Sequence, residues 1–333
     1  MSNSRAFDDG RWTMDDEESS MVHRPSSQFH SRNYAGLADL ERLKSFLMAQ
    51  RATGHTGYTH VGDLLWGMFM HTHMNPERDY RIWFAADGSV AGFLRLGQPG
   101  YFEMQVAAHL RGQVEPDMLA WVQAHYALAS VSAVAQPKTA AQPIKLTTEV
   151  MESETKTQAW LMAHGFARND FEMFILTCDL SKTEPPPALA NAVIRPVMGE
   201  GDFAERVSIH REVWEPSKVT LEGYRLTRAA PGYDPELDLA VVLDTGEFAA
   251  YCIVWPDALN KIAEFEPVGA RKAHRGKGFG KALLLDGFRR LREKGMTTAL
   301  VYCYANNLPF YKSAGFNVVD KYVGYELTMD DGR

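Results

Sequence analysis

The stretch that decides the fold is KIAEFEPVGARKAHRGKGFGKALLLDGFRRLREKG, residues 261–295. Its first ten residues predict a β-strand, and a basic, glycine-rich turn follows them. Leu284, Phe288 and Leu291 then recur at i, i+4 and i+7, which predicts an amphipathic helix that ends at Gly295. A strand that leads through such a turn into a helix N-terminus forms an anion site, because unpaired backbone N–H groups and the positive end of the helix dipole converge there.

The residues that the turn lacks limit the kind of phosphate ligand. A Walker loop needs Gly-Lys followed by Ser or Thr, whereas Lys277 is followed by Gly278 and Lys281 by Ala282, so this loop type is excluded. The G-x-G-x-x-G fingerprint of dinucleotide sites is also disfavoured, because Lys281 or Leu283 stands where its third glycine is required.

The turn Arg275-Gly-Lys-Gly-Phe-Gly280 resembles the R-x-x-G-x-G loop of the GNAT superfamily of N-acetyltransferases. The following strand TTALVYCYANN and the element Tyr311-Lys-Ser-Ala-Gly-Phe316 are similar to the next parts of that family, so the resemblance covers roughly residues 190–330. It implies an enzyme that transfers an acetyl group from acetyl-CoA to a primary amine of a small molecule or peptide. A merely flexible basic turn is the alternative.

The resemblance also implies a set of cofactor-binding residues. In the family, the amides of the loop hold the pyrophosphate of acetyl-CoA, and the strand before the loop binds the pantetheine arm. Carried over to this chain, these residues are Val268, Gly269, Ala270, Arg275, Gly276, Lys277, Gly278, Phe279, Gly280 and Lys281. The family commonly places an asparagine about seven residues before its tyrosine, but Asn307 precedes Tyr311 by only four, so Asn307 either binds the pantetheine or caps a helix.

Two catalytic roles follow from the chemistry. An alkyl ammonium with a pKa near ~10 must lose a proton before it attacks a thioester, and Glu264 and Glu266 are the candidate bases. We predict Glu264, because the resemblance places a glutamate there; a solvated or salt-bridged strand residue is the alternative for each. Tyr311 matches the family's tyrosine that protonates the departing thiolate, with a core aromatic as its alternative.

The length of 333 residues suits two domains, and the same order of signals occurs twice. Three signals recur about 150 to 164 residues apart: a hairpin, a strand that runs through Arg-Gly into a helix, and a short helix that ends in Gly-Phe. We therefore predict a tandem repeat of one α/β fold with mixed sheets, made of two GNAT-like domains. The predicted parts are a mobile polar tail (1–26), a degenerate N-terminal domain (27–180), a proline-rich linker (181–191) and a catalytic C-terminal domain (192–333).

The first copy lacks both functions of the second. Val114 and Pro116 replace the glycines of the loop, and Leu161 stands where the second copy has Tyr311. Because side chains fill the predicted phosphate site, we expect the first copy to supply packing, a wall of the acceptor site or a partner surface. The arrangement is similar to tandem members of the superfamily in which one half is degenerate.

Composition narrows the class of protein further. The formal net charge of −7 argues against a surface that binds nucleic acid, and the three widely spaced cysteines argue against a metal cage or disulfide scaffold. No apolar targeting or membrane-spanning stretch is visible, so we expect a cytoplasmic protein without a membrane partner. The sequence also contains a group of histidines, His55, His60, His71 and His73. They lack nearby cysteine or acidic ligands, so we predict no metal site.

Several alternatives stay open at this point. The chain could be a non-catalytic acyl-CoA-binding or regulatory module, or a transferase that uses a longer acyl-CoA. The identity of the amine acceptor and the choice between monomer and homodimer cannot be read from the sequence, because variable loops determine them.

Overall fold

The secondary structure repeats one order of elements in the two halves of the chain. The computed structural model describes residues 28–54, 57–97, 99–133 and 145–329, and the predicted tail lies outside them. The first half contains β1 (His30–Asn33), α1 (Leu37–Ala52), α2 (Val61–Phe69), α3 (Pro76–Asp79), β2 (Tyr80–Phe84), β3 (Val90–Leu96), β4 (Phe102–Val106), α4 (Glu115–Ala133), β5 (Lys145–Met151), α5 (Thr155–Ala163) and β6 (Ala167–Asp179).

The second half follows the same order without a counterpart of the short α3. It contains β7 (Ala192–Pro196), α6 (Gly199–Val213), α7 (Leu221–Arg228), β8 (Asp238–Leu243), β9 (Phe248–Asp257), β10 (Ile262–Ala270), α8 (Phe279–Glu293), β11 (Thr298–Cys303), α9 (Leu308–Ser313) and β12 (Asn317–Thr328). The predicted tandem α/β fold is confirmed. Both predicted hairpins are present, and their turns use Gly88 at φ 83° and Gly246 at φ 87°.

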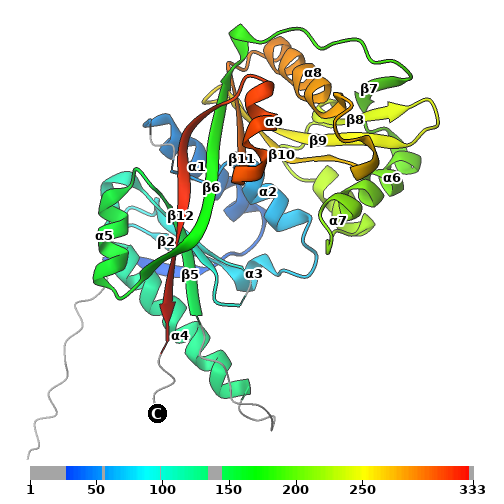
Figure 1. The fold of residues 1–333 in the computed structure, drawn as a ribbon. Helices are drawn as coiled ribbons and strands as arrows, with labels where there is room; N and C mark the ends of the chain where they lie inside the picture. The colour runs from blue at the N-terminus through cyan, green and yellow to red at the C-terminus, as the bar shows by residue number, and fades with distance from the viewer. Residues whose placement is uncertain (1–27, 55–56, 98, 134–144, 330–333) are drawn as a thin grey trace, which may run out of the picture.

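The strands form two sheets within the described residues. One has the order β1-β2-β3-β4, and the other has the order β5-β12-β6-β11-β10-β9-β8-β7. In the larger sheet, β6 of the first half pairs with β11, and β12 of the second half pairs with β5. The last strand of each half therefore completes the other half, and β6 and β12 run side by side through the middle of the molecule (Figure 1).

The predicted domain limits stay a prediction. The linker 181–191 separates the two halves along the sequence, but strands from both halves lie in the same sheet. The register of the exchanged pairs is continuous from Tyr322 opposite Met151 to Thr328 opposite Lys145. Strands of both halves share the larger sheet, so the segments 27–180 and 192–333 depend on each other for its backbone hydrogen bonds.

Two pairs of neighbouring strands diverge and open the structure for a ligand. The parallel strands β10 and β11 pair only from Ile262 to Glu264. In the first half, β4 forms no ladder with β5, and a single bridge joins Thr147 of β5 to Tyr101, the residue before β4. A bulge between Phe265 and Val268 also interrupts the pairing of β10 with β9. Each half therefore has an opening at the same place in its repeat.

Apolar packing joins the halves around these openings. Leu64 and Trp66 of α2 belong to the same buried cluster as Ile253 and Trp255 of β9. On the other face of the sheet, α8 packs on β8, β9 and β10 around Phe265. α2 of the first half thus joins α6 of the second half in covering the face of the sheet that α8 leaves free. No helix among the described residues has the length and apolarity needed to span a membrane.

The strand exchange predicts the behaviour of chain fragments. The fragment 192–333 lacks β6, so β11 presents an unpaired edge and β12 loses both neighbours. We expect it to aggregate or to unfold without a cooperative transition, as measured by size-exclusion chromatography and thermal circular dichroism. The fragment 167–333 retains β6 and serves as the matched control, with more soluble protein expected. A monomeric 192–333 fragment with the full chain's melting behaviour would contradict the exchange.

Candidate active site

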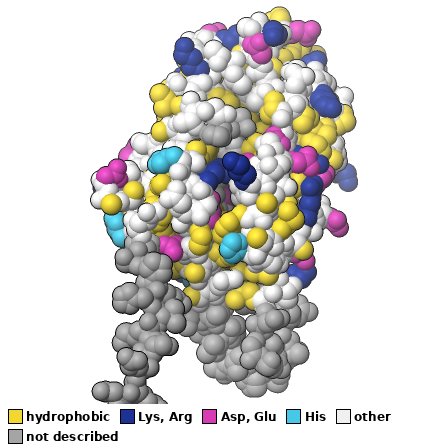
Figure 2. Space-filling view, turned by 90° about the vertical axis from the view of Figure 1, so that its left-hand side faces the viewer, with side chains coloured by type: hydrophobic (Ala, Val, Ile, Leu, Met, Phe, Trp, Pro, Cys, Tyr) yellow, Lys and Arg dark blue, Asp and Glu magenta, His cyan; other side chains and the backbone are white. Residues whose placement is uncertain are grey.

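A cavity of about 970 Å³ lies between the two halves. The first half contributes α2, β4 and β5 to its wall, and the second half contributes β10, the glycine-rich turn, the end of β11 and α9. The face shown in Figure 2 is hollowed near its centre, where Lys or Arg side chains border the hollow. The volume is that of a site for a small molecule or cofactor.

The glycine-rich turn presents an open anion site at one end of this cavity. Gly276 and Gly278 have φ values of 77° and 84°, and a Cβ atom on either one would meet no atom within 4 Å. Gly278 is the N-cap of α8, and no side chain caps this helix. The first amides of α8 are therefore free to bind an anion, and the open space beside the glycines fits a pyrophosphate group.

The basic residues of the turn surround this space without filling it. Arg275 and Lys281 line the cavity, and Nε of Arg275 donates to the carbonyl of Ala270 at 3.1 Å. Lys277 Nζ lies 3.3 Å from Nδ1 of His274. Phe279 and Gly280 line the cavity as well. All of the sequence-predicted loop residues except Lys277 thus line one end of the site.

In the corresponding turn of the first half, the carboxylate of Glu115 binds the backbone amide of the turn. The amide of Gly112, at φ 81°, donates to Oε2 of Glu115 at 2.7 Å. The neighbouring Arg111 forms an ion pair with Glu154. Because the carboxylate of Glu115 occupies the position where a bound phosphate would be needed, this turn is not available as a second pyrophosphate site.

The end of β10 lies along the cavity and is shaped by its bulge. Val268, Gly269 and Ala270 line the cavity, and the carbonyl of Glu266 accepts a hydrogen bond from Trp255 Nε1 at 2.7 Å. A Cβ atom on Gly269 would come within 2.6 Å of the Tyr251 ring, so only glycine fits here. These residues leave a strand edge beside the cavity where an extended pantetheine arm could bind.

The two candidate bases take different positions. Glu264 is fully buried beneath α2, where its Oε2 lies 3.1 Å from Nδ1 of His60, and it does not line the cavity. Glu266 does line it. Burial, with a smaller contribution from the charge of Asp63, raises the pKa of Glu266 to about 8, and burial raises the pKa of Glu264 to about 8 as well. The catalytic assignment of Glu264 stays a prediction, but the geometry favours Glu266 as the group that reaches a ligand.

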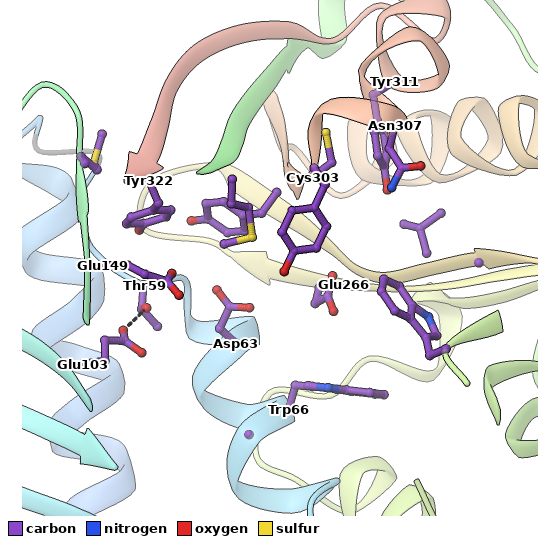
Figure 3. Close-up of a pocket in the computed structure, with 18 of the residues that line it drawn as sticks. Thr59, Asp63, Trp66, Glu103, Glu149, Glu266, Cys303, Asn307, Tyr311 and Tyr322 are labelled. Atoms are coloured by element: carbon purple, nitrogen blue, oxygen red, sulfur yellow. Dashed lines mark hydrogen bonds between the residues drawn. The ribbon is translucent and has the colours of Figure 1, made fainter. Parts of the chain in front are cut away.

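Tyr311 and Asn307 lie on the second half's side of the cavity, near Cys303 (Figure 3). The Tyr311 ring packs against Phe310 and Phe316, and burial, followed by the charge of Glu266, raises the pKa of its phenol. The phenol therefore keeps its proton at neutral pH. The side chain of Asn307 makes no capping hydrogen bond to α9, which leaves its amide free for a ligand.

The histidines of the first half are structural or line the cavity. His60 caps α2 by accepting a hydrogen bond from the amide of Gly62 at 3.1 Å, and burial lowers its pKa to about 3. His71 lines the cavity. His55 lies outside the described residues. No cluster of metal-ligating side chains is found in the part of the chain that the structure describes.

The sequence analysis did not identify the polar residues that the first half places in the cavity: Asp63, Arg95, Glu103 and Glu149. The internal repeat contains a signal for one of them. The Phe-Glu pair at 102–103 follows the first hairpin as the Phe-Glu pair at 265–266 follows the second, so Glu103 corresponds to Glu266. Asp63 and Glu149 have no comparable motif.

The chain is similar to several known proteins. Residues 205–316 match the model of the Acetyltransferase (GNAT) family. A mycothiol acetyltransferase of Corynebacterium efficiens is 28% identical over 149 residues, which cover 42% of this chain and 50% of that protein. The match thus spans about half the length of this curated relative.

Solved structures show the same fold over most of the chain. A tandem GNAT protein from the clavulanic acid biosynthesis pathway has a TM-score of 0.62 at 18% identity, covering 92% of this chain and 99% of that one. A GCN5-related N-acetyltransferase from Sphaerobacter thermophilus has a TM-score of 0.61 at 18% identity, covering 90% and 96%. The likeness extends across both halves.

The open turn predicts one CoA site per chain, with an affinity that depends on Gly278. In Gly278→Ala, the added methyl group enters the anion site, so we expect affinity for CoA to fall by about 10-fold or more in titration calorimetry. Gly295→Ala is the matched control, since Gly295 has φ 78° and equally open surroundings but lies at the other end of α8. Both variants lose about 1–2 kcal/mol of stability from the strained backbone.

Two comparable sites in the wild-type titration, or equal losses of affinity in the two variants, would contradict this assignment. Equal losses would mean that strain, and not occupation of the anion site, weakens binding.

Proposed function

Because residues 205–316 match the model of the Acetyltransferase (GNAT) family, we propose that this chain transfers an acetyl group from acetyl-CoA to a primary amine held between its two halves. The observation that carries the proposal is the convergence of three features on one cavity: the open anion site, the carboxyl group of Glu266 and the phenol of Tyr311. Acetyl-CoA supplies the activated acetyl group as a thioester.

The residues of the second half would hold the co-substrate along its length. The first amides of α8, with Arg275 and Lys281, bind the pyrophosphate, and Val268–Ala270 bind the pantetheine arm through the backbone. Asn307 offers an uncapped side-chain amide on the opposite wall. The turn and the strand thus lead the reactive end of the molecule toward Glu266 and Tyr311.

Glu266 is suited to accept the proton of the acceptor amine. A carboxylate with an ordinary pKa near ~4.3 is a weak base for an ammonium of pKa near ~10, and burial reduces this mismatch by raising the pKa of Glu266 to about 8. Glu264 is on the same strand but does not line the cavity, and burial and the charge of Glu266 both raise its pKa. We therefore assign the contact with the amine to Glu266 and an electrostatic role to Glu264.

Tyr311 is suited to the opposite proton transfer. Its phenol is protonated at neutral pH because burial raises its pKa, and it stands on α9 across the cavity from β10. A protonated phenol at this position can donate a proton to the departing thiolate. The two groups therefore perform complementary proton transfers.

Paired pH–rate profiles test the role of Glu266. The base must be ionised, and its pKa is raised, so kcat/KM is expected to be low below pH 7 and to rise through about pH 8. In Glu266→Gln, the rate should fall about 10²-fold or more and the inflection near pH 8 should vanish. In Glu264→Gln, the inflection near pH 8 should remain, because burial and the charge of Asp63 raise the pKa of Glu266. The opposite pattern would return the base to Glu264.

Substitution of Tyr311 by Phe tests the acid. The variant Tyr311→Phe keeps the ring, so affinity for acetyl-CoA should stay nearly constant while kcat falls about 10²- to 10⁴-fold. Tyr325→Phe is the control, since it also removes a buried hydroxyl. That hydroxyl donates a hydrogen bond to Gln158 over 3.0 Å, and neither residue lines the cavity. Tight CoA binding by a wild-type chain that transfers no acetyl group to any amine would leave the acyl-CoA-binding module as the better description.

A further inference from the structure

The cavity continues beyond Glu266 into the first half, and its character changes there. Figure 3 shows Glu266, Asp63 and then Glu149 beside Glu103 as successive carboxyl groups along one side of the cavity. Asp63 comes from α2, Glu149 from β5 and Glu103 from β4. The region that faces away from the glycine-rich turn is therefore lined by acids from several elements of the first half.

The two arginines that line this region are already paired with carboxylates. Arg95 binds Glu103 with nitrogen–oxygen distances of 2.8 and 3.0 Å, and Glu103 also accepts hydrogen bonds from Thr59 and Gln105. Arg111 is paired with Glu154. Among the described residues that line the cavity, no Lys or Arg forms an ion pair with Asp63, Glu149 or Glu266.

The pKa values of these carboxyl groups are raised, because burial and neighbouring negative charges disfavour their ionised forms. Burial and the charges of Glu264 and Glu103 raise the pKa of Asp63, and burial with the charge of Glu103 raises the pKa of Glu149 to about 7. Buried like charges repel each other, so a cation placed among them is strongly favoured.

A second observation points to the same kind of ligand. Nδ1 of His71 is buried and receives no hydrogen bond from a described residue, and the ring is neutral because burial lowers its pKa to about 4. A neutral imidazole nitrogen can accept a hydrogen bond from an ammonium group. The buried hydroxyl of Tyr302 also lines the cavity, but Arg51 is already its neighbour.

Aromatic side chains complete the lining. Trp66 and Tyr322 border the same carboxyl groups in Figure 3. Indole and phenol rings attract a cation through their faces and pack against methylene groups. An acceptor with a carboxylate or phosphate at this end would instead need an unpaired cation, which the described lining does not offer beyond the glycine-rich turn.

We propose that the acceptor is an alkyl diamine or polyamine, and that Asp63 and Glu149 bind its second ammonium group while its reacting nitrogen lies at Glu266. This assignment rests on the proposed acetyl transfer for the identity of the reacting nitrogen. The first half is then the part of the acceptor site that selects for charge at a distance from the reaction.

Equilibrium binding of two amines of equal length tests the proposal without relying on turnover. Titration calorimetry on the full chain, near pH 8 with CoA present, compares 1,4-diaminobutane with 4-amino-1-butanol, which replaces one ammonium by a hydroxyl. Charge-assisted hydrogen bonds predict that the diamine binds about 10- to 100-fold more tightly.

Variants locate the second charge. In Glu149→Gln, the preference for the diamine should drop to a few-fold while affinity for the amino alcohol stays the same, and Asp63→Asn should behave alike. Glu152→Gln is the matched control, because this exposed glutamate follows β5 and pairs with Arg168 and Lys321 outside the cavity. It should keep the full preference. The wild-type comparison needs no substitution, so poor folding of a variant cannot hide the answer.

The outcomes separate this proposal from the acetyl transfer itself. Equal affinities of the wild type for the two amines, or no binding of either, overturn the diamine assignment even when acetyl transfer to other amines is observed. Selective binding of the diamine without any acetyl transfer supports the assignment of the charged subsite and overturns the proposed function.

Discussion

The pairing of β6 with β12 is the interaction on which the rest of the structure depends. These strands are the last of their halves, and each also pairs with the penultimate strand of the other half. Backbone hydrogen bonds fix such pairs in register, so the two halves cannot slide past each other without losing a whole ladder. This fixed relation holds α2 and β5 opposite the open end of β10, and the cavity exists because of it.

Within that frame, diverging strands and buried carboxyl groups provide the chemistry. The separation of β10 from β11 after Glu264 exposes a strand edge, and the first half provides the opposite wall of the cavity beside it. In a region of low dielectric, Glu266 prefers its neutral form, and its pKa rises toward that of an amine. The packing that joins the halves therefore also makes a carboxyl group an effective base near neutral pH.

The sequence predicts well what local pattern determines. The loop Arg275–Gly280, the two hairpins and the element around Tyr311 follow from short motifs, and their positions agree with the structure. The rule that residues two apart share a strand face placed Glu264 beside Glu266, but the bulge after Phe265 breaks the alternation and only Glu266 reaches the cavity. The strand exchange and the carboxyl group of Glu149 depend on contacts between distant segments, which no local motif encodes.

The degeneration of the first half is what makes the cavity asymmetric. With two intact loops, pyrophosphate would be drawn to both ends of one space, and the carboxyl groups of the first half would face a second anion. Glu115 prevents this by holding the amide of Gly112 with its own carboxylate. The first half then keeps the opening between its strands β4 and β5 but does not bind phosphate there. The carboxyl groups that it places in the cavity favour binding of a cation. One half can thus bind the anionic co-substrate while its copy binds the acceptor, because their charges have become opposite.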